Sequence, residues 1–176
     1  MSVTSAEAAL LGLLCEGDKH PYQIEKDVQF RDMRFWTELS TSTIYKTLVR
    51  LEKMDLLESV TEISEQNRAR KVYRITPEGR EDFQDALREL LREPEHLRWQ
   101  ADVAFYNLGA LETSEQLELL SSYKTALEKA VTEFRELEKF MLDMQCPVQH
   151  VSIARRWTFL AEGEIRWVDD FIGRLQ

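Results

Sequence analysis

Residues 40–50 combine side chains that could contact nucleic acid. Hydroxyl, phenol and cationic groups gather here at Ser42, Thr43, Tyr45, Lys46 and Arg50. When one end of a helix enters a major groove, such groups can hydrogen-bond to base edges and to phosphate oxygens. We therefore expect these five residues to contact DNA.

A helix of about three turns is the element that must present these side chains. Ile44, Leu48 and Leu51 recur at i, i+4 and i+7, which places them on one buried stripe. Ser40 and Thr41 are good N-cap residues for this helix. The polar side chains then occupy the opposite, exposed face.

Two strands joined by a basic turn follow this helix. After Asp55, which tolerates the left-handed conformation that ends a helix, residues 56–63 and 72–76 alternate apolar and polar side chains, a pattern typical of strands. The polar tip between them, residues 64–71, is long enough to protrude as a wing. We expect three cations of this tip to reach phosphates or a minor-groove edge: Arg68, Arg70 and Lys71.

Each of these features taken alone is more often structural than functional. An amphipathic helix with exposed lysines is usually just solvated, and a basic turn by itself says little more. Short helices, an amphipathic helix and a basic hairpin in this order are much more specific than any one part. The hydroxyl of Tyr22, near the start of the second short helix, is a weaker candidate for phosphate contact.

Roughly residues 6–83 resemble the PadR family of transcriptional regulators. The resemblance is carried by Ala9–Leu14, His20–Ile24, Thr43–Tyr45 with the leucines that follow, and Lys71–Arg80. Pro21 and Asp55 stand where the family usually has glycine. Proline is favourable at a helix start and aspartate is tolerated at a helix end, so neither departure threatens the fold.

The resemblance implies a winged helix-turn-helix with a helical dimerisation domain, usually in a repressor that a ligand releases from DNA. We accordingly expect a mostly α-helical chain with a small β-wing. Residues 1–92 would form the DNA-binding domain with a linking helix. Residues 93–176 would form an antiparallel helical domain for dimerisation and possible effector binding.

The net charge of −9 and the pI near 5.0 argue against DNA binding, but the charge is unevenly distributed. Residues 1–80 carry 12 Lys and Arg against 13 Asp and Glu, whereas residues 81–176 carry 11 against 19. Residues 66–80 hold five cations and a single acid, Glu78. Because exposed charges more than about 8 Å apart are largely screened, we expect the local positive field of the wing to govern contact with DNA.

The second half of the chain is predicted to be almost entirely helical. Apolar residues at spacings of three and four predict one helix from Thr113 to about Cys146 and another from Val148 to about Leu175. Thr113 and Gln116 have the spacing of a capping box. A hairpin of two helices, each about 40 Å long, is too thin to bury both apolar faces. A second copy is the simplest partner, because a symmetric dimer presents two recognition helices to a pseudo-palindromic operator.

Aromatic residues of the second half indicate either an effector pocket or a core. Four of them could line a pocket for a small aromatic ligand: Trp99, Phe105, Trp157 and Trp167. Arg155 could receive the carboxylate of an acidic ligand, whereas the surrounding acids could attract a cationic one. The same rings could instead pack in the core and the dimer interface. The sequence leaves both questions open.

Several functional classes are disfavoured by the sequence. It has no glycine-rich phosphate loop, nucleophile elbow or zinc-protease motif, so we expect neither an enzyme nor a cofactor. Cys15 and Cys146 lack companions at metal-ligand spacing, so we expect no metal site. No apolar run reaches the roughly 18 residues of a membrane span, and we expect a cytoplasmic protein. The competing function is a winged-helix protein-interaction module with a helical oligomerisation arm and no DNA binding.

Overall fold

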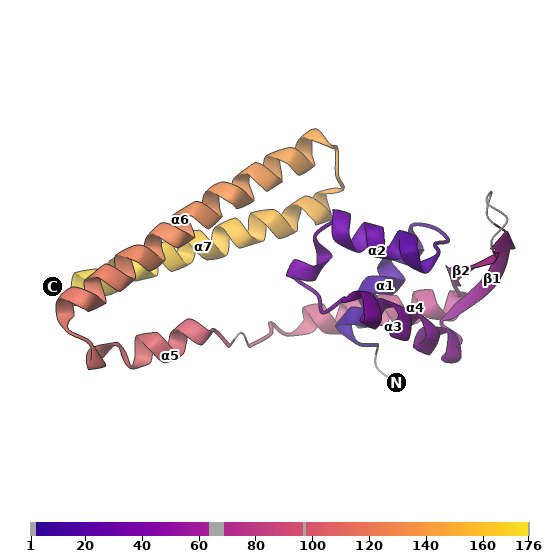
Figure 1. The fold of residues 1–176 in the computed structure, drawn as a ribbon, viewed down its shortest axis with the longest axis horizontal. Coiled ribbons are helices and arrows are strands. Elements are labelled where there is room, and N and C mark those ends of the chain that lie inside the picture. The colour runs from indigo at the N-terminus through magenta and orange to yellow at the C-terminus, as the bar shows by residue number, and fades with distance from the viewer. Residues whose placement is uncertain (1–2, 64–68, 97, 176) are drawn as a thin grey trace. The chain divides into compact units, whose positions relative to one another are not determined.

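The chain divides into two compact units, Met1–His96 and Leu97–Gln176. The computed structural model describes residues 3–63, 69–96 and 98–175 (Figure 1). Helices dominate both units, and the described strands form one small antiparallel hairpin in the first unit. The predicted fold class, mostly α-helical with a small β-wing, is confirmed.

The first unit contains the short helices and the hairpin that the sequence predicts. Its elements are α1 (Ser5–Cys15), α2 (Pro21–Phe30), the 3-10 helix η1 (Met33–Phe35), α3 (Thr41–Lys53), β1 (Leu57–Ile63), β2 (Ala69–Ile75) and α4 (Pro77–Arg92).

Local capping signals begin and end the helices of this unit. Ser40 caps α3 by accepting a hydrogen bond from the Thr43 amide, as predicted. Thr76 caps α4 in the same way, by accepting a hydrogen bond from the Gly79 amide, with Pro77 in the first turn. Asp55 follows α3 with a φ of 59°, which confirms the left-handed turn expected there.

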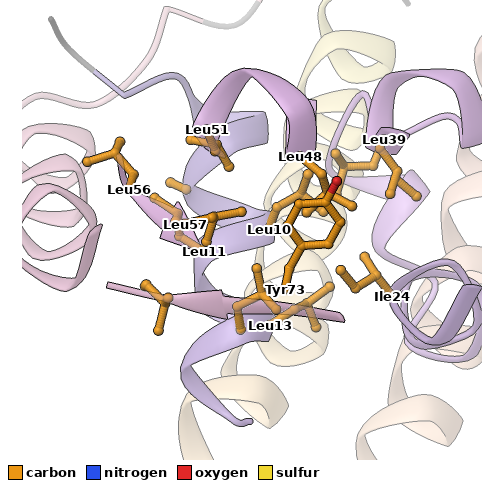
Figure 2. Packing of buried hydrophobic residues seen from close by; sticks show 14 of the residues in the cluster. Leu10, Leu11, Leu13, Ile24, Leu39, Leu48, Leu51, Leu56, Leu57 and Tyr73 are labelled. Carbon is orange, nitrogen blue, oxygen red and sulfur yellow. The ribbon is translucent and has the colours of Figure 1, made fainter. Parts of the chain in front are cut away.

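The core of the first unit forms where α1, α2, α3 and the strands meet (Figure 2). Ile44, Leu48 and Leu51 of α3 are fully buried, so the predicted apolar stripe is confirmed. They pack in one cluster with leucines of α1 and with Ile24 of α2. Because this stripe fixes which side of α3 faces inward, the opposite side is exposed to solvent.

The wing, defined here as β1, β2 and the residues between them, is fixed to the body of the unit at its base. The strands pair from Leu57↔Ile75 to Ile63↔Ala69. Lys19 and Tyr73 exchange backbone hydrogen bonds of 3.0 and 3.1 Å, which attach β2 to the segment between α1 and α2. Gly79 permits a close approach at the start of α4, because a Cβ there would lie 2.1 Å from the Leu56 carbonyl oxygen.

One sequence prediction about the wing is wrong. Ala69, Arg70 and Lys71 belong to β2 and not to the polar tip. The ladder extends this far because Glu62 and Arg70 face each other as an oppositely charged cross-strand pair. The remainder of the predicted tip, residues 64–68, lies outside the described residues, and so does Arg68.

The second unit is a long helical hairpin with a short helical segment before it. Its elements are α5 (Gln100–Tyr106), the 3-10 helix η2 (Leu108–Ala110), α6 (Thr113–Asp143) and α7 (Val148–Leu175), and Figure 1 shows α6 and α7 side by side. The two long helices agree with the predicted spans. The predicted capping box at Thr113 is wrong, because Glu112 is the N-cap. The side-chain amide of Gln116 instead donates to the Leu111 carbonyl at 2.7 Å.

Candidate nucleic-acid interface

The exposed face of α3 carries most of the side chains predicted to contact DNA. Ser42, Tyr45, Lys46 and Arg50 are exposed, while Thr43 is half-buried. The Thr43 hydroxyl lies 2.7 Å from the hydroxyl of Ser40, so it already takes part in capping the helix. Lys46 forms no ion pair with the residues that the structure describes, which leaves its ammonium available to an external anion.

Arg50 differs from Lys46 because it already has an acidic neighbour within the fold. Its Nε lies 3.2 Å from Oε1 of Glu7 on α1, and the Glu7 side chain is only 3% exposed. The other Glu7 oxygen accepts hydrogen bonds from the amide and the hydroxyl of Thr4. Oε1 accepts no hydrogen bond within the described structure, so the contact with Arg50 is an ion pair without a well-directed N–H. Glu7 therefore holds Arg50 by charge at the edge of the exposed face.

Arg34 fixes the segment that leads into α3. Its Nε donates to the Leu39 carbonyl at 3.0 Å, and its NH2 group donates to the Thr41 hydroxyl at 3.4 Å. Glu25 of α2 lies 3.6 Å from the same guanidinium and also accepts from the Thr41 hydroxyl. These contacts tie α2 to the first turn of α3 and thereby set the direction in which α3 presents its N-terminal end.

The described cations of the wing are all paired with carboxylates. Arg70 lies 3.7 Å from Glu62, and Lys71 lies 2.6 Å from Glu52. Arg74 lies 2.6 Å from Asp18. A charge count over residues 66–80 therefore overstates the positive field of the wing, because the acids that face these cations come from α3, β1 and the segment after α1.

Glu52 joins α3 to both strands of the wing. Its carboxylate accepts hydrogen bonds from the Lys71 ammonium on β2 and from the Ser59 hydroxyl on β1. The hydrogen bond from Lys71, and after it the one from Ser59, holds the pKa of Glu52 below its usual value. The hydrogen bond between Lys71 and Glu52 also raises the pKa of Lys71. Both groups are therefore charged at neutral pH, and the wing is held against the C-terminal half of α3.

Tyr22 lies on the exposed side of α2, where the residue is 57% exposed. The ring stacks on His20 at a centroid distance of 6.2 Å, and the Lys26 ammonium lies 4.7 Å from its centroid. Lys26 therefore adds a cation beside the hydroxyl proposed for phosphate contact.

The second unit brings together only some of the aromatic residues predicted to bind an effector. Trp99, Phe105 and Trp167 line one cavity of about 310 Å³, together with Asp102 and Glu164. Trp157 instead stacks on Phe134 at a centroid distance of 6.2 Å. Arg155 lies 3.9 Å from Glu138, and it does not line this cavity.

Four acids important to these sites were not identified from the sequence. Glu7 was recognisable as part of a Thr4–Glu7 capping box, but its contact with Arg50 depends on how α1 packs against α3. Glu52, Asp102 and Glu164 resemble any other acid of a solvated helix until the fold places cations or aromatic rings beside them.

The described residues contain neither a cluster of metal ligands nor a membrane-spanning helix. No group of three or more His, Cys, Asp or Glu side chains there is placed to hold a metal ion. Among the same residues, the helices are all too short or too polar to cross a membrane.

A family model matches part of the chain. The model of the transcriptional regulator PadR-like family matches residues 10–85. A comparison with curated proteins found no match.

Solved structures share the fold over nearly the whole chain. Bacillus subtilis PadR in complex with operator DNA matches with a TM-score of 0.82 at 18% identity, covering 97% of this chain and 98% of that one. The same regulator in complex with p-coumaric acid matches with a TM-score of 0.80 at 17% identity, over 96% and 94% of the two chains. The Vibrio cholerae virulence activator AphA matches with a TM-score of 0.71 at 18% identity, over 97% and 98%.

At these identities the structural matches establish the fold, while the family model covers α2, α3 and the wing together with parts of α1 and α4. The matched family is one of transcriptional regulators and not of enzymes. Residues 10–85 of the chain therefore match the PadR-like family of transcriptional regulators, and the chain as a whole shares the fold of the PadR structures.

Proposed function

We propose that this chain is a homodimeric, sequence-specific DNA-binding repressor of the cytoplasm whose binding a small aromatic ligand relieves. The observation that carries the proposal is the exposed polar face of α3 on the side opposite a fully buried apolar stripe. This face holds Tyr45 and Lys46, and Lys46 forms no ion pair with the part of the chain that the structure describes. A related fold, that of Bacillus subtilis PadR, has been solved in complex with operator DNA.

Direct contact with bases is assigned to the N-terminal part of α3. Ser42, Tyr45 and Lys46 offer a hydroxyl, a phenol and an ammonium, all exposed, to a major groove. Thr43 contributes through a hydroxyl shared with Ser40, and Arg50 contributes from the edge of the face.

Phosphate contact is assigned to the wing and to α2. Arg68, Arg70 and Lys71 are the proposed wing contacts, and Tyr22 is the proposed contact from α2. Because Arg70 and Lys71 are ion-paired with Glu62 and Glu52, each must exchange an acidic partner for a phosphate when DNA binds. We therefore assign more of the affinity to α3 than the charge count alone would suggest.

Dimerisation is assigned to the second unit because it exposes many apolar side chains near the turn of its hairpin. The exposed residues around this turn are Leu137, Phe140, Leu142, Met144 and Val148, and Phe159 is exposed further along α7. Monomeric proteins rarely expose so many large apolar side chains on neighbouring elements. A two-fold symmetric contact between copies would cover them and would pair two α3 helices for a pseudo-palindromic operator.

Release by a ligand requires that the ligand prefer the arrangement of the dimer that does not bind DNA. The cavity beside Trp99, Phe105 and Trp167 is the proposed ligand site, whereas Trp157 and Arg155 lie away from it. The p-coumaric acid complex of Bacillus subtilis PadR supports ligand binding by a protein of this fold.

One observation favours the second candidate, a winged-helix protein-interaction module without DNA binding. The described wing cations are paired with acids, and this reduces the positive charge that DNA binding would use. A salt-titrated gel shift on DNA flanking the chain's own gene separates the two candidates. The repressor should shift this DNA at lower concentration than unrelated DNA and lose affinity as salt rises. Absence of any shift at low salt would favour the interaction module.

A further inference from the structure

The carboxylate of Glu7 is buried and depends on Arg50 for its compensating charge. The Glu7 side chain is 3% exposed, and its Oε1 accepts no hydrogen bond from the described residues. A buried charge without a partner is strongly destabilising. The described cation that pairs with Oε1 is Arg50 of α3, whose Nε lies 3.2 Å away.

The other carboxylate oxygen of Glu7 is held firmly by Thr4. Oε2 accepts hydrogen bonds from the Thr4 amide at 2.8 Å and from the Thr4 hydroxyl at 2.9 Å. The Thr4 hydroxyl also accepts from the Glu7 amide at 3.3 Å, which completes a capping box at the start of α1. Because α1 packs against α3, the fold fixes the place of Oε1 beside Arg50.

The outer side of Arg50 is open to solvent. Its side chain is 56% exposed, and its guanidinium forms no other ion pair or side-chain hydrogen bond with the described residues. A guanidinium carries five N–H donors in a planar fork. When Nε is drawn toward Glu7, the donors on NH1 and NH2 remain available to an external acceptor.

The position of Arg50 on α3 indicates which acceptor this is. Ser42, Lys46 and Arg50 recur every four residues and therefore share one face of the helix. Ser42 and Arg50 are separated by about 12 Å along the helix axis. With the N-terminal part of α3 in a major groove, as proposed above, Arg50 meets the phosphate backbone that borders the groove before it meets a base.

We propose that Glu7 is a positioning residue for DNA binding, which holds Arg50 so that NH1 and NH2 donate to one phosphate in each half-site. The inference rests on the proposed DNA-binding function and gives a role in it to a residue too buried to touch DNA. An exposed arginine samples many rotamers and loses that freedom when it binds. An ion pair with a fixed carboxylate removes part of this loss in advance.

Glu7→Gln tests the proposal because it keeps an oxygen for Thr4 and places a neutral amide beside Arg50. Fluorescence anisotropy over a salt series, with duplex DNA flanking the chain's own gene, measures the effect. The substitution should weaken binding about fivefold and flatten the salt slope by nearly one counterion. Glu81→Gln removes the same charge from an exposed position of α4 and should change neither quantity. Tighter binding by Glu7→Gln would show that Glu7 competes with phosphate for Arg50 and would overturn the proposal.

A double-variant cycle separates positioning from a general loss of stability. Arg50→Ala should weaken binding at least as much as Glu7→Gln does. Adding Glu7→Gln to it should cause no further loss, because no guanidinium remains to be positioned. Circular dichroism at the binding temperature verifies that each variant is folded. Losses that add in the double variant would show that Glu7 acts on DNA binding without Arg50, which contradicts the proposal.

Single uncharged phosphates in the DNA locate the contact itself. A methylphosphonate at the phosphate that Arg50 contacts should weaken the wild-type protein about fivefold and the Glu7→Gln variant much less. Equal losses in the two proteins at every position would overturn the positioning role. A wild-type protein that binds none of this DNA would instead refute the DNA-binding function on which the role rests.

Discussion

The guanidinium of Arg50 on α3 lies 3.2 Å from the carboxylate of Glu7 on α1. This contact joins the proposed DNA-binding surface to the interior of the first unit. Arg50 is 56% exposed, whereas Glu7 is 3% exposed, so the pair spans the boundary between solvent and core. Arg50 consequently serves the stability of the fold as well as any contact with DNA.

Arg50→Ala should lower the free energy of unfolding by about 1–3 kcal/mol, because it leaves a buried carboxylate without its compensating charge. Adding Glu7→Gln should restore part of this loss, since a neutral amide tolerates burial better than an unpaired charge. Urea denaturation of the single and double variants measures both changes. Lys46→Ala is the control, as it removes from the same helix face a cation that has no ion pair among the described residues. Strictly additive losses would show that the two side chains do not interact.

Glu52→Gln should lower the free energy of unfolding by about 0.5–1 kcal/mol at neutral pH, the size expected of a solvent-accessible pair. Because the pKa of Glu52 is lowered by Lys71 and Ser59, its contribution is present above the unfolded-state pKa and is lost as pH falls through the folded-state value. The difference between wild type and variant should therefore vanish in acid. Glu81→Gln, at an exposed position of α4, should show no comparable pH dependence.

The same Glu52→Gln substitution should tighten DNA binding while it destabilises the fold. It releases the Lys71 ammonium and removes one negative charge beside the wing. A released cation that reaches a phosphate also steepens the dependence of affinity on salt by nearly one counterion. Fluorescence anisotropy with labelled duplex DNA over a salt series measures both quantities. A weaker complex with an unchanged salt slope would remove Lys71 from the interface.

Phe140→Glu combined with Phe159→Glu should convert the proposed dimer into a folded monomer. Phe140 is 55% exposed and Phe159 is 62% exposed, so the new charges disturb a partner surface more than the protein's own core. Sedimentation should report the monomer mass, and circular dichroism should report unchanged helicity. Thr132→Glu, at an exposed position of α6, adds the same charge elsewhere and should leave the dimer intact. A double variant that stays dimeric would place the interface on another surface.

The local elements of this protein were predictable because short-range signals determine them. Ser40, Thr76 with Pro77, and Asp55 each mark a helix end with a preference that depends on neighbouring residues alone. The span of α7 followed equally well from the apolar spacing after Pro147.

The charges and rings of the candidate sites were harder to predict, because their partners come from distant parts of the chain. Lys71 was expected to be available to phosphate, yet the fold places Glu52 of α3 against it. Trp157 and Trp167 lie on one helix, but Trp167 lines the cavity while Trp157 stacks on Phe134. Strand register and helix packing decide which side chains meet in these contacts. Neither can be read from a count of charges or from the spacing of aromatic residues.

The exposed face of α3 is proposed to distinguish one DNA sequence from others, and substitution of Lys46 tests this most directly. The decisive measurement is the ratio of dissociation constants for competitor DNA and for an operator found beside the chain's own gene, determined at one salt concentration. Lys46→Ala should reduce this ratio about tenfold, the value of one lost base contact. Lys53→Ala, at the far end of the same helix, should leave the ratio unchanged. An unchanged ratio for Lys46→Ala would contradict direct reading of bases by this residue.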